Sequence, residues 1–299
     1  ELEGVFKIRR VGKRVFGGWR RGEKRGGVIE FKRKMGLPSG EKSTQSEDDK
    51  RFMEGLAAAR SVYVDSRVMR VVQMQKVFQD RKSVVDMPMK EKPEVILAAF
   101  DKEFPLEDGV DERDVVYDND KVREFVYQYF DAPGKDIVPA EPYDLKSDPG
   151  FIQRIQDKGL SNFAATINFL WKDFGRKLSP EVRVNPERFS LLPRNGIMIV
   201  PGGRFRESFF WDTYGIVRGL LVCEMIDTSK EVVQNLAEDV SRFGFPPNGG
   251  RIYYDNRSQP PLLSEMVISV FEADKDRDFV RKVLDELEVE YEFWMLAND

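Results

Sequence analysis

The chain has 299 residues, of which 41% are hydrophobic and 33% are charged, so it is long enough for one large domain or two small ones with a substantial core. It contains one cysteine, Cys223, and no histidine. These counts exclude a disulfide framework, thiolate metal clusters, His-ligated zinc and nucleophiles activated by histidine. The 52 Asp and Glu residues leave carboxylate chemistry open, beside Lys, Tyr or a cofactor that the sequence does not specify.

Charge is distributed unevenly along the chain. Residues 1–42 hold 13 Lys or Arg against 5 Asp or Glu, a net charge of +8, so the remaining residues carry −12 of the total of −4. A basic arm of this kind can contact nucleic acid or anionic lipid. Its Gly-rich, aperiodic composition favours a simpler interpretation, a disordered leader over residues 1–50 with no nucleic-acid partner. The leader lacks the apolar stretch of a secretory signal peptide.

Helical periodicity of apolar residues begins near Arg51, and strand-like alternation is almost absent. Thr228 and Glu231 fit a capping box, Gly244 fits a left-handed cap, and Pro93 fits a first helical turn. No apolar run approaches the roughly 18–20 residues that a membrane span requires. We therefore predict a soluble all-α protein over residues 51–299. Helices are expected in SRVMRVVQMQKVF, from Pro93, over Val122–Phe130 and Gly150–Leu178, in DTYGIVRGLLVCEM, and over Thr228–Gly244, Leu262–Glu272 and Asp276–Trp294.

Two loops between these helices have an unusual composition. The first, Pro201–Trp211, opens the stretch PGGRFRESFFWDTY. Arg204 offers a rigid fork of donors, Trp211 a flat apolar face, and Asp212 two acceptor oxygens. Such a combination suits a sugar, whose hydroxyl groups each need a partner while its ring face is apolar. A phosphate group fits less well, because Glu207 and Asp212 would repel it.

The second loop, Pro247–Pro261, uses the same residue types. Its polar side chains are Asn248, Arg257, Ser258 and Gln259, and buried groups of this kind would cost about 1–3 kcal/mol each if left unpaired. In a helical array the two loops can share one rim. The alternative is that their charges only fix the loops to the helices, with Arg206 and Glu207 as the expected structural pair.

At these residues the sequence resembles the trehalases, which hydrolyse α,α-trehalose to two glucose molecules. PGGRFRESFFWDTY matches the first trehalase signature except at Phe209, where the signature usually has Tyr. GFPPNGGRIYYDNRSQPPLL resembles the family's next block. VVQMQKVFQDRKSVVDMPMK, with Asp80, Lys82 and Asp86, resembles its N-terminal block, and ERFSLLP and YEFWM fit as well. The resemblance extends roughly from Val71 to Trp294.

The resemblance implies an (α/α)₆ toroid whose loops form a sugar pocket, and inverting hydrolysis by two carboxyl groups without a metal or other cofactor. Carried over residue by residue, it implies that the glucose-binding positions are Arg204, Trp211, Asp212, Asn248, Arg257, Ser258 and Gln259. A glycan on Asn256 would block such a pocket, so the Asn256-Arg257-Ser258 triplet is not interpreted as a glycosylation site. Trehalases include secreted, lipid-anchored and cytoplasmic members, so the resemblance leaves the location open.

The segments to which the resemblance assigns the catalytic Asp and Glu do not occur in this sequence. We therefore expect the N-terminal half of a trehalase domain over residues 51–299, with no catalytic residue before Asp299 and no trehalase activity from this chain alone. Half a toroid would also expose apolar helix faces. Two alternatives stay open: a toroid glycosidase of other specificity, and a non-catalytic protein of trehalase type that binds sugar or a partner.

Overall fold

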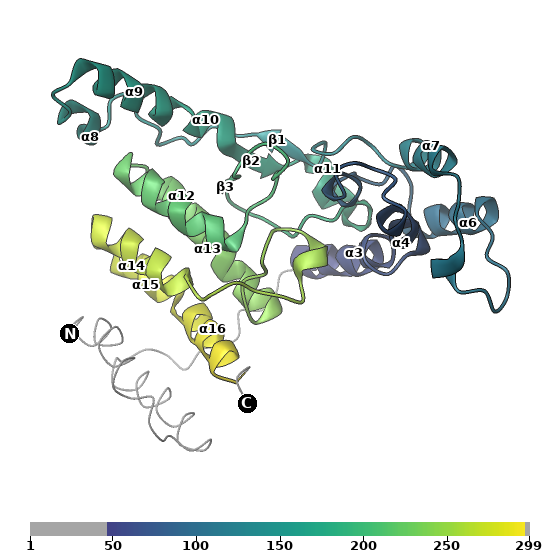
Figure 1. Ribbon diagram of the computed structural model, residues 1–299. Helices are drawn as coiled ribbons and strands as arrows, with labels where there is room; N and C mark the ends of the chain where they lie inside the picture. The colour runs from purple at the N-terminus through teal and green to yellow at the C-terminus, as the bar shows by residue number, and fades with distance from the viewer. Residues whose placement is uncertain (1–46, 297–299) are drawn as a thin grey trace. The chain divides into compact units, whose positions relative to one another are not determined.

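A computed structural model describes residues 47–296 (Figure 1), all of which belong to one compact unit of the chain. The predicted leader lies outside the described residues as far as residue 46, and residues 47–50 belong to helix α3, Glu47–Tyr63. The prediction of an all-α protein is confirmed, because helices joined by long loops dominate the described part. Within it, no helix is long and apolar enough to cross a membrane.

The elements follow one another with few strands between them. After α3, the helices are α4 (Arg67–Met74), α5 (Lys82–Val85), α6 (Pro93–Glu103), α7 (Asn119–Tyr129), α8 (Gly150–Gln153), α9 (Lys158–Phe169), α10 (Trp171–Phe174), α11 (Pro180–Val184), α12 (Phe210–Val222), α13 (Ile226–Phe243), α14 (Leu263–Asp274), α15 (Arg277–Lys282) and α16 (Leu284–Leu296). The strands are β1 (Ile137–Pro139), β2 (Gly175–Leu178) and β3 (Met198–Ile199), and the 3₁₀ helices are η1 (Glu112–Asp114), η2 (Pro186–Arg188) and η3 (Ile252–Tyr254).

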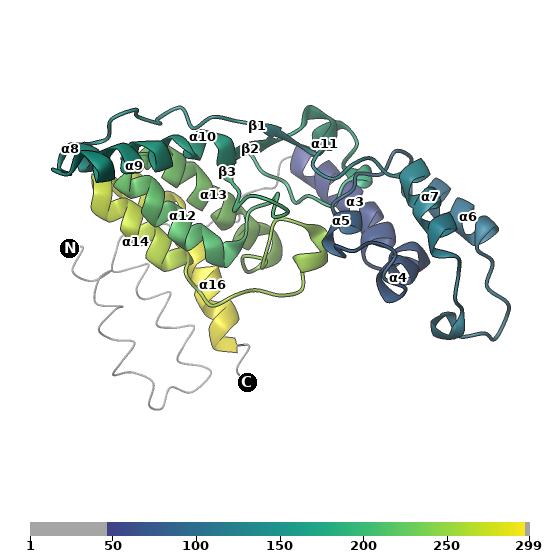
Figure 2. The ribbon, with the colours of Figure 1, turned by 45° about the horizontal axis from the view of Figure 1, so that its top comes forward.

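The described unit has two hydrophobic cores. One is built around α3, α4, α6 and α7, with Phe100 and Phe125 in edge-to-face contact at 5.2 Å between ring centroids. The other lies among α12, α13 and α14, which pack side by side (Figure 2) and bury Val217, Val233 and Val270. The two loops singled out in the sequence immediately precede α12 and connect α13 to α14, so the second core positions both.

The long helix predicted over Gly150–Leu178 is wrong. The segment forms α8, α9 and α10 and then strand β2, which pairs antiparallel with β1 and β3. A Cβ atom at Gly175 would lie 1.9 Å from the carbonyl oxygen of Ala140, so a glycine permits the two backbones to meet there. Tertiary pairing across this close approach overrides the local helical pattern.

The capping box predicted at Thr228 is also wrong. Helix α13 begins at Ile226, and the Thr228 backbone N–H and hydroxyl group donate hydrogen bonds to Asp144. Glu231 instead accepts a hydrogen bond from the backbone N–H of Ile197 at 2.9 Å. Both side chains thus form hydrogen bonds with distant segments of the chain rather than with the start of α13. The left-handed cap at Gly244, with φ of 81°, is confirmed.

Other predicted helix boundaries hold to differing extents. Pro93 occupies the first turn of α6 as predicted. The single helix predicted over Asp276–Trp294 is interrupted at Val283, which separates α15 from α16. The Asp276 side chain caps α15 by accepting hydrogen bonds from two backbone N–H groups.

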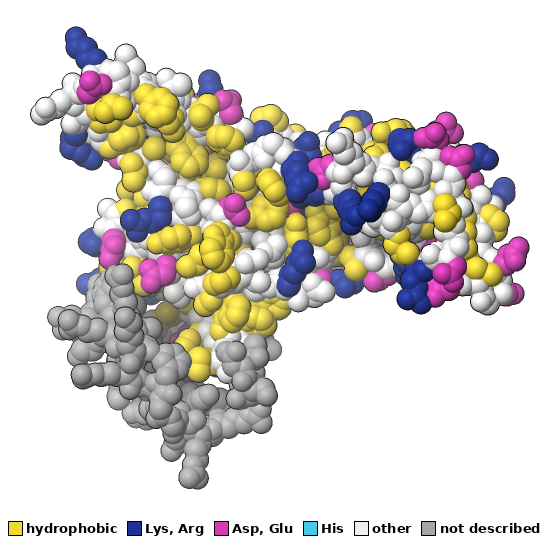
Figure 3. All heavy atoms as spheres, in the orientation of Figure 1, with side chains coloured by type: hydrophobic (Ala, Val, Ile, Leu, Met, Phe, Trp, Pro, Cys, Tyr) yellow, Lys and Arg dark blue, Asp and Glu magenta, His cyan; other side chains and the backbone are white. Residues whose placement is uncertain are grey.

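An apolar stripe is exposed on α9. Leu160, Phe163 and Ile167 follow helical spacing and are between 46% and 63% exposed, with Leu170 just beyond the helix at 43%. Figure 3 shows hydrophobic side chains gathered over α9 and α10, at its upper left. Exposed apolar patches of this kind promote association.

Candidate functional site

The first loop turns sharply at two glycines before α12 begins. Gly202 and Gly203 have φ angles of +101° and +60°, in the region that favours glycine. Gly202 exchanges backbone hydrogen bonds with Phe205, at N···O distances of 3.3 and 3.1 Å. A Cβ atom at Gly202 would lie 2.8 Å from the ring of Phe174, whereas one at Gly203 would meet nothing within 4 Å. The turn thus packs on one side and leaves Arg204 exposed on the other.

The two loops are joined to each other by backbone hydrogen bonds. The Phe210 N–H donates to the Asn248 carbonyl oxygen at 3.1 Å, and the Gly250 N–H donates to the Ser208 carbonyl oxygen at 2.8 Å. Between these bonds, Phe209 and Gly249 form a β-bridge. The structure therefore brings the two loops side by side.

A row of aromatic rings connects the loops, with an arginine at each end. Phe209 contacts Phe205 and Tyr254, at centroid distances of 5.3 and 5.7 Å. The Arg204 guanidinium lies over the Phe205 ring at 5.1 Å, and the Arg257 guanidinium lies over the Tyr254 ring at 4.9 Å. This aromatic row connects the two arginines that the sequence predicted, through the largely buried rings of Phe209 and Tyr254.

A buried cluster of charges lies beneath the loops. The Arg251 side chain is fully buried, and its guanidinium pairs with Asp136 at 2.7 Å, Asp86 at 3.1 Å and Glu207 at 3.5 Å. Lys82 pairs with Glu207 at 2.8 Å and also with Asp86. We call these five residues the ionic cluster. It links the Lys82–Asp86 segment to both loops.

The composition of the ionic cluster determines its electrostatics. It holds three carboxylates against two cations, and burial raises the pKa of Glu207, to which the negative charge of Asp86 adds, while Arg251 and Lys82 oppose the increase. The Tyr253 hydroxyl donates to Asp86 at 2.7 Å, and burial raises the pKa of Tyr253 well above its usual value. Burial thus raises the pKa of both Glu207 and Tyr253 above their usual values.

The predicted structural pair of Arg206 and Glu207 is wrong. Glu207 accepts a hydrogen bond from the Arg206 backbone N–H at 3.1 Å, but its ion pairs are with Lys82 and Arg251. The Glu207 side chain points into the buried cluster, so the neighbouring side chain along the chain cannot be its partner.

The predicted binding residues fall into two groups. Arg204, Trp211, Asp212 and Arg257 are exposed. Arg204 pairs with Asp80 at 2.7 Å, whereas within residues 47–296 neither Asp212 nor Arg257 has an ion-pair partner. The others bond within the second loop or to the residue just before it: Gln259 donates from its amide to the Asn248 side-chain oxygen, and the Ser258 hydroxyl donates to the Pro246 carbonyl oxygen at 2.6 Å. The first group faces outward, and the second shapes the loop.

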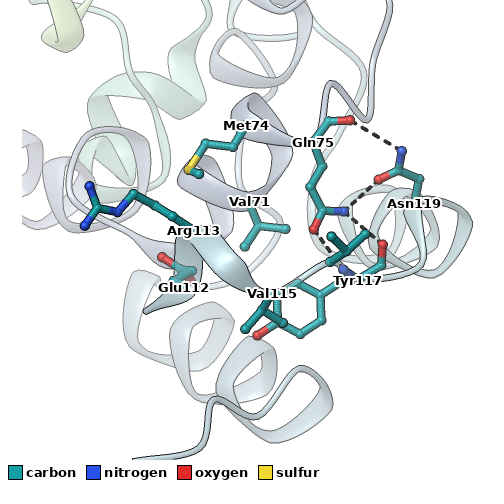
Figure 4. Close-up of a pocket in the computed structure, with 9 residues that line it drawn as sticks. Val71, Met74, Gln75, Glu112, Arg113, Val115, Tyr117 and Asn119 are labelled. Carbon is teal, nitrogen blue, oxygen red and sulfur yellow. Dashed lines mark hydrogen bonds between the residues drawn. The ribbon is translucent and has the colours of Figure 1, made fainter. Parts of the chain in front are cut away.

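A pocket of about 430 Å³ lies elsewhere, between α4 and the segment around η1 (Figure 4). Its polar groups are already paired: the Gln75 amide group bonds to Tyr117 and Asn119, and Glu112 pairs with Arg67 and Arg70. Arg113, on its rim, pairs with Asp111. Because these partners are internal, the pocket is a weaker candidate than the exposed loops for a polar ligand.

Sequence reasoning did not identify the residues of the ionic cluster as part of the site. Lys82 and Asp86 stand four residues apart, a spacing that brings helical side chains together, but that spacing does not reveal Glu207 or Arg251 as further partners. Within residues 47–296, no group of three His, Cys, Asp or Glu side chains is arranged to hold a metal ion.

Comparisons with known proteins identify the family. The trehalase family model matches residues 76–299. The chain is 39% identical over 236 residues to trehalase from Bombyx mori, covering 79% of this chain and 40% of that protein. It is 39% identical over 233 residues to trehalase from Homo sapiens, covering 78% and 39%. It is 46% identical over 173 residues to a probable trehalase from Oryza sativa, covering 57% and 31%.

This helical protein with two joined loops is thus similar to proteins named as trehalases. The chain belongs to the trehalase family, and its mostly helical structure is consistent with the α/α toroid of that family. It spans two fifths or less of the length of these three curated relatives.

Replacement of Arg251 by Met is expected to lower the free energy of unfolding by about 3–5 kcal/mol, because it leaves three buried carboxylates with one cation. Urea denaturation followed by circular dichroism measures the change. Arg281→Met is the matched control, since Arg281 forms an exposed pair with Asp278 whose loss costs at most about 1 kcal/mol. Equal losses in both variants would contradict this role for Arg251.

Replacement of Glu207 by Gln is expected to change how stability depends on pH. The folded protein holds the Glu207 proton to a higher pH than the unfolded chain does, so this group's contribution to stability falls as pH rises through that interval. The glutamine variant lacks this loss. Its free energy of unfolding, relative to wild type, should therefore increase as pH rises above 4.5, the usual pKa of a glutamate side chain. Urea denaturation across this range, with Glu94→Gln on the exposed face of α6 as control, tests the sign.

Proposed function

We propose that the rim formed by the two loops binds a glucose unit of α,α-trehalose, and that the chain provides this surface to a trehalase-type glycoside hydrolase. The observation that carries the proposal is the aromatic row with Arg204 at one end and Arg257 at the other. Two exposed donor forks, one at each end of the row, match a ligand with hydroxyl groups on several sides.

The chemistry of the exposed side chains supports this choice of ligand. Asp212, in the first turn of α12, offers acceptor oxygens for hydroxyl donors. Trp211 is 55% exposed, and its flat apolar ring suits the C–H face of a sugar. A large aromatic side chain left this open at a helix start is not part of the core.

The internally bonded residues have a second role in the proposal. Gln259 uses one amide proton on Asn248, so the Asn248 amino group and the Gln259 oxygen remain available to a ligand. Ser258 donates to Pro246 and keeps its lone pairs as acceptors. These three residues bind sugar from positions that their own hydrogen bonds fix.

The proposed reaction is inverting hydrolysis, in which a carboxylic acid protonates the glycosidic oxygen and a carboxylate activates water on the opposite face. The buried carboxylates of the ionic cluster are engaged by Arg251 and Lys82 beneath the loops, which does not suit them to either role. We therefore propose that this chain binds sugar without hydrolysing it.

Arg257→Ala is expected to weaken trehalose binding by about 10–100-fold, the loss that corresponds to hydrogen bonds from a charged donor. Isothermal titration calorimetry of the full chain measures the dissociation constant. Arg218→Ala provides the control, because Arg218 is an exposed arginine on α12 outside both loops. Titration with maltose and sucrose separates trehalose specificity from another glycoside, and a variant that binds as wild type does would refute the assignment of Arg257.

The purified chain is expected to release no glucose from trehalose. In our proposal it has no pair of carboxyl groups at the rim that donates a proton and activates water. A coupled glucose oxidase assay measures release over many hours. Boiled protein provides the baseline, and glucose production above that baseline would disprove the proposed lack of activity.

A further inference from the structure

The segment Asp80–Asp86, which belongs to neither loop, touches both of them. Asp80 pairs with Arg204 of the first loop at 2.7 Å, and Lys82 pairs with Glu207 of the same loop. Asp86 accepts a hydrogen bond from Tyr253 of the second loop. Lys82 and Asp86 are members of the ionic cluster, with side chains that are 10% and 0% exposed. Asp80 reaches the surface, where its side chain is 33% exposed.

Asp80 is held by its own backbone. One of its carboxylate oxygens, Oδ1, accepts the backbone N–H of Lys82 at 3.0 Å and also accepts Nη1–H of Arg204 at 2.7 Å. A short turn of this kind, from an Asp side chain to the N–H two residues on, fixes the side-chain conformation. The direction from which Asp80 meets the guanidinium is therefore set by the start of α5.

Arg204 is restrained from two sides. Its Nη1 is bound by Asp80, and its guanidinium lies over the Phe205 ring at 5.1 Å. Because the guanidinium is planar and rigid, these two contacts fix its plane and leave its remaining N–H groups for a ligand. The Arg204 side chain is still 55% exposed. An arginine ordered before binding loses less conformational freedom when the ligand arrives.

We propose that Asp80 is a positioning residue, which orients Arg204 toward a sugar hydroxyl group through the shared oxygen Oδ1. The inference rests on the proposed function for the role of Arg204. It adds a third segment to the sugar site, one that acts on the ligand only through the guanidinium.

Asp80→Asn tests this role with little disturbance of the turn. The amide oxygen of asparagine still accepts the Lys82 N–H, but the negative charge that pairs with the Arg204 guanidinium is lost, and the bond to Arg204 is weakened. Trehalose binding measured by calorimetry should weaken by about tenfold, with an unchanged melting temperature. Asp101→Asn is the matched control, because Asp101 on α6 pairs with Nη1 of Arg67 at 2.6 Å, outside both loops. Unchanged binding by Asp80→Asn overturns the proposal.

A double-mutant cycle separates positioning from a general effect on the loop. In an Arg204→Ala background, Asp80→Asn should cause no further loss of binding, because its effect passes through the guanidinium. A loss in that background as large as in the wild type would show that Asp80 acts otherwise, and would overturn the proposal.

A measurement without sugar distinguishes this proposal from the proposed function. NMR of the ¹⁵N-arginine-labelled chain reports rotation of each guanidinium, and the Arg204 signal is assigned by its loss in Arg204→Lys. Asp80→Asn should speed rotation of the Arg204 guanidinium and leave that of Arg67 unchanged. If this result is obtained and trehalose does not bind, the proposed function fails while the orientation of Arg204 by Asp80 stands. An unchanged Arg204 signal overturns the orientation itself.

Discussion

The site depends on the ion pairs that the buried Arg251 guanidinium forms with three carboxylates. A cation without exposure to water must be paired and hydrogen-bonded, and its partners Asp86, Asp136 and Glu207 come from three separate segments. Ser190 adds a further acceptor at 2.8 Å. Because these three carboxylates converge on one side chain, their ion pairs hold the three segments together. Arg251 and Glu207 belong to the two loops, so the same ion pairs fix the loops in place.

The polar groups of the loops and of the cluster beneath them are of two kinds: those bonded within the protein, and those that face outward. Charges beneath the loops pair with one another, three carboxylates with two cations, and the amide and hydroxyl groups of the second loop bond to that loop or to the residue before it. Asp212 and Arg257 face outward with no ion-pair partner in the described part of the chain. A loop that charges merely fix to the rest of the fold would use all of its exposed charges internally, as Arg204 uses Asp80. This division is what favours a binding surface over a purely structural one.

Prediction from sequence succeeded where the controlling interactions are local. Pro93 and Gly244 mark helix ends because their backbone preferences act within one turn. It failed where a distant group competes. Gly175 joins a strand because Ala140 approaches it closely, and Thr228 bonds to Asp144 rather than capping its own helix. The pairing of Arg206 with Glu207 failed for the same reason, since Lys82 and Arg251 are the partners that the fold brings near.

The sequence by itself determined the helical class, the two loops with their residue types, and the resemblance to trehalases, because periodicity, turn chemistry and motif order are properties of neighbouring residues. Only the tertiary structure decided which charges are buried and which face outward. Those contacts join residues 115 to 167 positions apart, as in Arg251 with Asp136, Lys82 with Glu207, and Tyr253 with Asp86. The energy of an ion pair depends on distance and burial, and neither quantity exists until segments so far apart along the chain have packed together.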